Sequence, residues 1–134
     1  MAGYSGTPLV KKLGLKPGHT ISIINPPENY FELLQIPEMH SGKKGKFDFI
    51  HCFVKKLDEL EKTLPKLKNQ LEDHGMIWIS WYKKSSKIST DVTEDAIRSL
   101  AINSGLVDVK VCAIDDQWSG LKLVIPLKNR NSKK

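Results

Sequence analysis

The sequence predicts a three-layer α/β domain of about five strands that ends in an antiparallel hairpin. Strand-like and helix-like segments alternate along the 134 residues, which is typical of a sheet covered by helices. Segments 47–54 and 76–81 are apolar almost throughout, as strands are when both of their faces are covered. The last two strand-like segments are joined by a turn too short for a crossover helix, so we expect them to pair antiparallel.

Residues that begin or end helices and strands set the expected boundaries. Thr7 and Pro8 suit the N-cap and first position of a helix, and Asp91 with Glu94 resembles a capping box. The expected elements are, in order, a short helix ending at Gly14, strand 21–24 stopped by Asn25-Pro26-Pro27, a short helix from residue 28 or 29, strand 47–54, a helix from 57, strand 76–81, a helix from 91 to Gly105, strand 106–114 and strand 121–127.

The helix expected from residue 57 has one apolar face. Its five leucines, three or four residues apart, form a stripe that packs on a sheet: Leu57, Leu60, Leu64, Leu67 and Leu71. Pro65 interrupts the pattern, which predicts either a kink or two short helices of which Pro65 begins the second. We expect Gly75 to cap the C-terminus of this segment.

Composition indicates one domain over 1–128 and a polar basic tail over 129–134. The net charge is +6, but four basic residues lie at the C-terminal end, and without them the charge is close to neutral: Lys128, Arg130, Lys133 and Lys134. No apolar run suits a signal peptide or a membrane span, so we expect a cytoplasmic protein without membrane partners. No Cys/His spacing matches a zinc site, and no metal is expected.

Several motifs together resemble a family of uncharacterised bacterial proteins, known only as a domain of unknown function. The motifs that carry the resemblance are Tyr4-Ser5-Gly6-Thr7-Pro8-Leu9, Lys16-Pro17-Gly18, Trp81-Tyr82-Lys83-Lys84, Asp91-Val92-Thr93-Glu94 and Trp118-Ser119-Gly120-Leu121-Lys122. This resemblance covers nearly the whole chain. It implies no activity and supplies no catalytic residues.

A looser resemblance, at the level of the fold, is to S-adenosylmethionine-dependent methyltransferases. The segment Leu15-Lys16-Pro17-Gly18-His19-Thr20 resembles the lead-in to the first strand of that family, and the terminal hairpin resembles its last two strands. The resemblance implies a truncated Rossmann-like, methyltransferase-like sandwich with the strand order one, two, three, five, four. In that order Cys52 and Cys112 lie on strands that are not neighbours, so we expect both thiols to be free.

The sequence departs from this family where the cofactor would bind. Asn25-Pro26-Pro27-Glu28-Asn29 follows the first strand and contains no glycine, although a glycine-rich turn allows the close approach of a cofactor. Residues 35–46 leave little room for the second parallel strand that would end in an acidic ribose ligand. We therefore expect no cofactor and only weak binding of S-adenosylmethionine.

The candidate site lies beyond the carboxyl ends of the parallel strands, where open α/β sheets bind ligands. The candidate ligand-binding residues are Asn25, Trp81, Lys83, Lys84, Ser85, Tyr4 and Trp118. Lysines and hydroxyls favour phosphate, an aromatic ring can stack on a base, and the segment around Tyr4 could close over the edge. The alternative interpretation makes Trp81 a core residue, the lysines a solvated loop and Trp118 a cover for the sheet edge.

The main functional expectation is a non-catalytic ligand-binding or regulatory domain that takes a phosphate-bearing small molecule. A minimal S-adenosylmethionine-dependent methyltransferase is the first alternative. A nucleic-acid-binding protein that uses Lys43, Lys44 and Lys46 with Lys83, Lys84 and Lys87 is the second, less favoured one. No catalytic residue is singled out, because the sequence contains no nucleophile elbow or phosphate loop, and the oligomeric state is left open.

Overall fold

A computed structural model of the chain describes residues 9–16, 20–28, 30 and 46–129. It shows a mixed α/β fold, as expected. The described elements are α1 (Leu9–Leu13), β1 (Ile21–Ile24), β2 (Phe47–Phe53), α3 (Leu57–Asn69), β3 (Leu71–Tyr82), the 3-10 turn η1 (Lys84–Ser86), α4 (Glu94–Asn103), β4 (Val107–Ala113), β5 (Trp118–Val124) and the 3-10 turn η2 (Leu127–Asn129). The Thr7-Pro8 helix start lies outside the described residues.

The five strands form one sheet in the order β1-β2-β3-β5-β4. β1, β2 and β3 run parallel, and β5 pairs antiparallel with both β3 and β4. The predicted strand order and the predicted hairpin are thus confirmed. Cys52 lies on β2 and Cys112 on β4, which are not neighbours, and both cysteines are free as expected.

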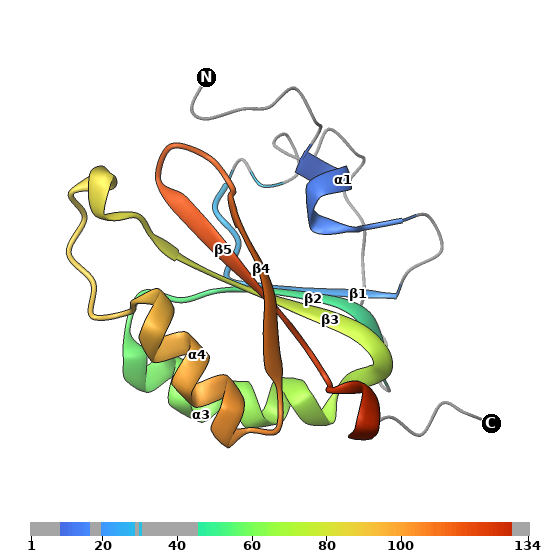
Figure 1. Ribbon diagram of the computed structural model, residues 1–134. Helices are drawn as coiled ribbons and strands as arrows, with labels where there is room; N and C mark the ends of the chain where they lie inside the picture. The colour runs from blue at the N-terminus through green and yellow to red at the C-terminus, as the bar shows by residue number, and fades with distance from the viewer. Residues whose placement is uncertain (1–8, 17–19, 29, 31–45, 130–134) are drawn as a thin grey trace.

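The sheet separates two layers (Figure 1). α3 and α4 cover the side that we call the helical face, whose core is mostly aliphatic and includes Leu60, Leu64, Ile79 and Ile97. α1 covers the other side, which we call the aromatic face; its core includes Tyr30, Phe49, Phe53, Trp78 and Trp118. The indole Nε1 of Trp78 donates a hydrogen bond of 2.8 Å to the carbonyl of Leu13, which fixes α1 on the sheet.

α3 is one helix, so the expectation of two helices divided at Pro65 is wrong. Proline has no N–H, so one carbonyl of the preceding turn of the helix loses its donor. Pro65 is on the exposed side of the helix, where water can donate to that carbonyl instead. Leu60, Leu64 and Leu67 are buried on the opposite side of the helix, which packs on the sheet as the leucine spacing predicts.

Gly75 is not a helix cap, because α3 ends at Asn69 with Gln70 as its C-cap. Gly75 instead lies inside β3, which begins at Leu71 and is longer than expected. The register between β2 and β3 shifts between Phe47 and Phe49. A side chain at position 75 would put its Cβ 2.7 Å from Leu71 Cδ1 and 2.9 Å from the Phe47 carbonyl oxygen. The glycine is therefore needed for close packing of strand on strand.

The expected capping box at Asp91 is also corrected. Thr93 is the N-cap of α4, and its hydroxyl oxygen accepts the Ala96 N–H at 3.1 Å. Asp91 accepts the N–H of Leu57 at 2.8 Å and so caps α3, the neighbouring helix. A sequence pattern shows which residues can cap a helix but not which helix they reach.

The terminal hairpin differs from the expected one in the start of its last strand, and it contains a β-bulge. β5 begins at Trp118 rather than at residue 121, because Asp115 Oδ1 accepts the N–H groups of both Gln117 and Trp118 and tightens the turn. The pairing of β4 with β5 shifts register between Asp108 and Lys110, which places a bulge on β4. Among the described helices, none has the length and apolar character needed to cross a membrane.

Candidate functional site

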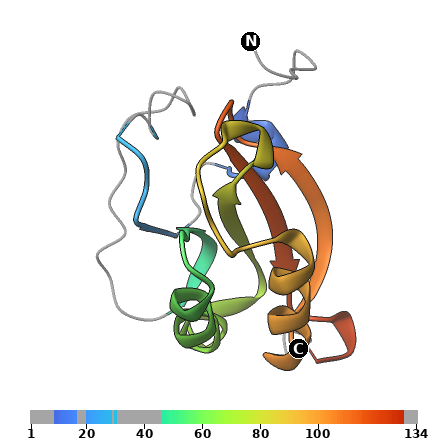
Figure 2. The same ribbon diagram turned by 90° about the vertical axis from the view of Figure 1, so that its left-hand side faces the viewer.

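The carboxyl ends of β1, β2 and β3 lie at one edge of the sheet, which faces the viewer in Figure 2. We call it the carboxyl edge. The residues that follow the three strands there are Asn25, Val54-Lys55 and Lys83. The described residues line two cavities along this edge, one at the ends of β1 and β2 and the other at the end of β3.

The first cavity, which we call the crevice, has a volume of about 360 Å³ and is lined by Asn25, Pro26, Phe53, Lys55 and Glu59. Asn25 adopts a left-handed backbone conformation with φ 55°, which is uncommon for residues other than glycine. Glu59 Oε1 accepts the Lys55 N–H at 3.2 Å, which places this carboxylate at the junction of β2 and α3. The crevice thus presents one cationic and one anionic side chain.

The second cavity, which we call the lysine pocket, has a volume of about 530 Å³. Its lining residues are Trp81, Tyr82, Lys83, Lys84, Lys87, Ile88, Ser89, Thr90, Val92, Thr93 and Glu94. Of the predicted site residues, Trp81, Lys83 and Lys84 meet here, whereas Asn25 lines the crevice instead. Ser85 is exposed and is not part of the lining of either cavity.

Local hydrogen bonds fix the turn that carries the lysines. Ser86 Oγ donates to the Lys83 carbonyl at 2.6 Å and accepts the Ile88 N–H at 3.2 Å. The Lys83 N–H donates to the Gln117 carbonyl at 2.8 Å, which ties the turn to the β4–β5 hairpin. Lys87 has φ 63°, a left-handed conformation that a residue with a side chain rarely adopts. The turn is therefore held in place rather than merely solvated.

One hydrogen bond joins the linings of the lysine pocket and the crevice. Thr90 Oγ1, in the lining of the pocket, donates to the carbonyl of Lys55 at 2.7 Å, and Lys55 lines the crevice. Next to this bond, Asp91 Oδ1 accepts the N–H of Leu57, although neither residue lines either cavity. The two cavities are therefore connected through one lining residue of each.

Trp118 is 4% exposed, which agrees with the alternative interpretation that its ring covers the sheet. Its ring stacks on Tyr82, with centroids 4.2 Å apart, and meets Phe53 edge-on at 5.0 Å. Trp118 lines neither cavity and instead supports the end of β3 from the aromatic face. The predicted lid residue Tyr4 lies outside the described residues.

Beneath the carboxyl edge, the aromatic face holds a buried polar cluster that we call the relay: Tyr30, His51 and Ser80. His51 Nδ1 lies 2.9 Å from the Tyr30 hydroxyl, and His51 Nε2 lies 2.7 Å from Ser80 Oγ. Burial lowers the pKa of His51 to about 3, so the imidazole is neutral at pH 7. His51 and Ser80 are both fully buried, which makes them satisfied core groups rather than a nucleophile and its base.

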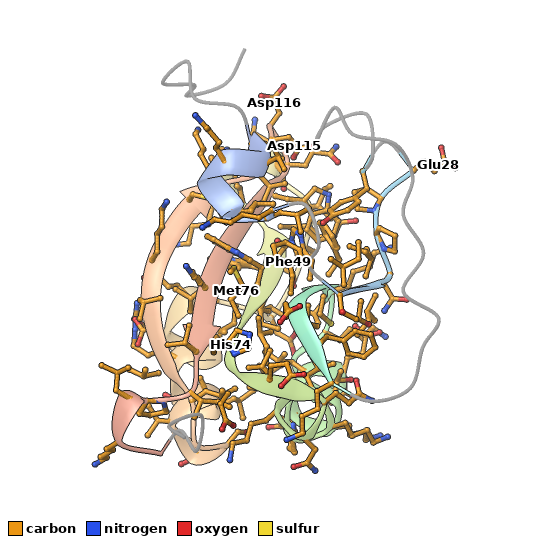
Figure 3. All side chains as sticks on the ribbon, turned by 90° about the vertical axis from the view of Figure 1, so that its right-hand side faces the viewer. Glu28, Phe49, His74, Met76, Asp115 and Asp116 are labelled. Carbon is orange, nitrogen blue, oxygen red and sulfur yellow. The ribbon has the colours of Figure 1, made fainter. Side chains whose placement is uncertain are left out.

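Among the described residues, the cysteines and the adjacent carboxylates of Asp115 and Asp116 do not add a catalytic or metal-binding group. Burial, and secondarily the charge of Glu59, raises the pKa of Cys52 to about 12, which keeps this thiol protonated at pH 7. The carboxylates of Asp115 and Asp116 lie in the β4–β5 turn, where they are labelled in Figure 3. The structure groups no three metal-ligating side chains in the part of the chain that it describes.

No family model matches the chain, and no curated protein sequence matches it. The motif resemblance to an uncharacterised family is therefore not supported by these comparisons.

Solved structures do match the fold. Magnesium protoporphyrin IX methyltransferase from Synechocystis with bound S-adenosylmethionine has a TM-score of 0.59 and 14% identity, and the match covers 88% of this chain and 74% of that one. Ribosomal protein L11 methylase from Lactobacillus delbrueckii has a TM-score of 0.56 and 14% identity, over 87% and 74%. The CcbJ methyltransferase from Streptomyces caelestis has a TM-score of 0.54 and 7% identity, over 87% and 86%.

Another structure of the Synechocystis enzyme, with a TM-score of 0.52 and 13% identity, matches 63% of this chain and 47% of its own length. The chain thus spans about half of that protein in one match and about three quarters in another.

These matches confirm the fold-level resemblance and correct the main functional expectation. A non-catalytic ligand-binding domain was expected, but the structural neighbours are methyltransferases, some with S-adenosylmethionine or its product bound. At these identities the matches show the fold alone, a Rossmann-like methyltransferase fold.

Proposed function

We propose that the chain is a small S-adenosylmethionine-dependent methyltransferase whose cofactor site is the crevice. The observation that carries this proposal is that Lys55 and Glu59 both line one cavity at the carboxyl ends of β1 and β2. Ligands of open α/β sheets bind beyond the carboxyl ends of the strands. The amino-acid end of the cofactor carries one carboxylate and one ammonium group, and the crevice offers one charge of each complementary sign.

The crevice fits the amino-acid end of the cofactor better than its ribose. Asn25 takes the left-handed conformation that a glycine would otherwise supply in such a turn. Pro26 and Pro27, however, offer no backbone N–H donors. β1 forms the outer edge of the sheet in the described part of the chain, so no neighbouring strand end supplies an acidic ribose ligand there. Glu28, the acidic residue of the turn, points away from the sheet (Figure 3).

The cofactor, when bound, supplies an activated methyl group on its sulfonium. The chain's own residues position it. Lys55 binds a carboxylate, and Glu59 binds an ammonium group. The hydrogen bond from the Lys55 backbone N–H to Glu59 Oε1 keeps the Glu59 carboxylate at the junction of β2 and α3, beside the residue that carries the lysine side chain. Phe53, in the lining of the crevice, gives an apolar contact that excludes water from the end of β2.

Calorimetric titration with S-adenosylmethionine up to millimolar concentration tests the proposal. Because the ribose acceptor is missing from the described residues, we expect weak binding, with Kd on the order of 100 μM. Lys55→Gln removes a charged hydrogen-bond donor to the carboxylate and should weaken binding about tenfold. Glu59→Gln should weaken it to a similar extent.

Lys56→Gln is the matched control. Lys56 is exposed, adjacent to Lys55 and not part of the crevice lining, so its substitution should leave Kd within about twofold. Binding that is unaffected by all three substitutions would place the cofactor elsewhere. If the titration shows no heat of binding at a millimolar concentration of S-adenosylmethionine, the proposed function itself is contradicted.

A further inference from the structure

We propose that the lysine pocket binds the methyl-acceptor substrate, and that this substrate bears an anionic oxygen group on an apolar body. The acceptor role rests on the proposed function, whereas the binding of an anion by the pocket does not. The anionic group is a carboxylate or a phosphate, since both present charged oxygens that lysine ammonium groups bind.

The charge of the pocket is positive and not internally neutralised. Lys83, Lys84 and Lys87 come from one turn and line one cavity. Glu94 lines it too, but its carboxylate is paired with Arg98, four residues along α4. The ion pairs of the described residues engage none of the three lysines. An anionic ligand would therefore meet three cations whose charge is not already matched.

The rest of the pocket is suited to an apolar body. Trp81 and Val92 are buried core residues that reach the lining from the sheet and from the segment before α4. Ile88 lines the same cavity and is 37% exposed, so part of its apolar side chain is open to a ligand. An apolar ring or chain in the cavity would cover Ile88 while its charged group meets the lysines.

The pocket is built before a ligand arrives. The Ser86 hydrogen bonds and the Lys83 N–H bond fix the turn, and Lys87 is held in a left-handed conformation. Such strain persists only where the surroundings impose it, and it concentrates at binding sites. The Thr90–Lys55 hydrogen bond connects one lining residue of the pocket with one lining residue of the crevice. A substrate in the pocket would thus lie beside the cofactor in the crevice.

The volume favours a small molecule over a nucleic acid. A cavity of about 530 Å³ lies within the range of small-molecule sites. The three lysines are concentrated on one turn, whereas binding of a nucleic-acid backbone needs basic residues spread along a groove. Lys43 and Lys44, which would extend such a surface, lie outside the described residues.

The test is a titration of the ¹⁵N-labelled chain with phenyl phosphate and with benzoate, followed by amide shifts in 81–94. Benzyl alcohol is the neutral ligand of matched shape. We expect both anions to shift this segment with millimolar affinity and benzyl alcohol to bind at least tenfold more weakly. The triple variant Lys83→Gln, Lys84→Gln, Lys87→Gln should bind phenyl phosphate more than tenfold more weakly than the native chain. The remaining affinity should no longer depend on the salt concentration.

A second triple variant, Lys56→Gln, Lys62→Gln, Lys66→Gln, removes the same charge from exposed positions at and along α3 and should bind phenyl phosphate as the native chain does. Absence of shifts in 81–94, or equal losses in both triple variants, would overturn the site. A short oligothymidylate that binds more tightly than phenyl phosphate through the same lysines would overturn the small-molecule assignment.

Cofactor binding, measured separately, distinguishes the two proposals. If phenyl phosphate binds but S-adenosylmethionine does not, the proposed function fails and the acceptor role falls with it, although the anion site stands. If S-adenosylmethionine binds but no anion shifts 81–94, this inference alone fails. Binding of both, with each lost only in its own variants, supports the two sites side by side.

Discussion

The two faces of the sheet are stabilised by different kinds of interaction. On the helical face, α3 and α4 pack aliphatic side chains such as Leu64 and Ile97 against the sheet. On the aromatic face, rings meet edge to face or stack, and His51 is hydrogen-bonded to Tyr30 and Ser80 in a fully buried position. One face thus depends on apolar area, and the other also depends on the direction of its hydrogen bonds.

Because of this difference, the two faces should tolerate substitutions to different degrees. Apolar burial is proportional to area and non-directional, so it tolerates exchanges of similar volume. A buried polar cluster stabilises only the arrangement that satisfies all of its members. Phe53 links the cluster to the site, because its ring stacks on His51 at 4.3 Å and also lines the crevice. The aromatic face therefore allows fewer positions for the strand ends at the carboxyl edge than the helical face does, because its hydrogen bonds are directional.

The largest effect is expected on the helical face. Leu64 is a fully buried residue of α3 on the side that packs against the sheet, and Leu64→Ala should lower the free energy of unfolding by about 2–5 kcal/mol, since it removes apolar area and leaves a cavity. Urea unfolding followed by circular dichroism measures this loss. Lys62→Ala, at an exposed position of the same helix, should change stability by less than about 0.5 kcal/mol. Equal losses in the two variants would mean that the helical face does not carry the core.

A smaller effect, with a distinctive pattern, is expected for the relay. Ser80→Ala removes the partner of His51 Nε2 and should cost about 1–3 kcal/mol because a buried ring nitrogen is left unpaired. In a chain that already carries His51→Leu, the same substitution should be nearly neutral. A double-mutant cycle by urea unfolding measures the difference. Additive losses would show that the two side chains do not act together.

The smallest expected effect is a dependence on pH. His51 has a pKa near 6.5 when unfolded and about 3 when folded, so the unfolded state binds more protons between these values. Stability contributed by this group is complete above pH 6.5 and is lost as the pH falls toward 3. Between pH 7 and 5.5 the loss should be about 1 kcal/mol. The His51→Leu chain should show a smaller loss over this interval, and an unchanged loss would assign the acid sensitivity to other groups.

Much of the fold was predictable because its signals are local. The leucine spacing of α3 and the tight turn before β5 each follow from a few consecutive residues, and the strand order followed from the fold-level resemblance. The errors occurred where a residue acts on a distant partner. Asp91 caps α3 rather than its own helix, and Gly75 is required by the Phe47 carbonyl oxygen of the neighbouring strand. Such contacts leave no trace in sequence periodicity.

The candidate site was predictable only in part for the same reason. Trp81, Lys83 and Lys84 are consecutive or nearly so, and the strand end brought them together as expected. That Lys55 and Glu59 line one cavity was not predicted from the sequence, although two opposite charges four residues apart at the end of an apolar strand were a usable signal. For Trp118 the sequence left two interpretations open because its turn is polar, and the contacts of the ring with Tyr82 and Phe53 agree with a cover for the sheet.

The bulge on β4 has a consequence for how copies of this protein behave at high concentration. β4 is the outer strand of the described sheet, and Val107, Val109 and Val111 are at least one-third exposed on it. A regular strand of this composition would be a template for sheet growth from one copy to the next. The bulge between Asp108 and Lys110 breaks the even spacing of the backbone groups along that edge, and two opposite charges flank it. A second copy that paired along this outer strand would therefore meet an interrupted backbone pattern and two charges where a regular strand would offer a continuous edge.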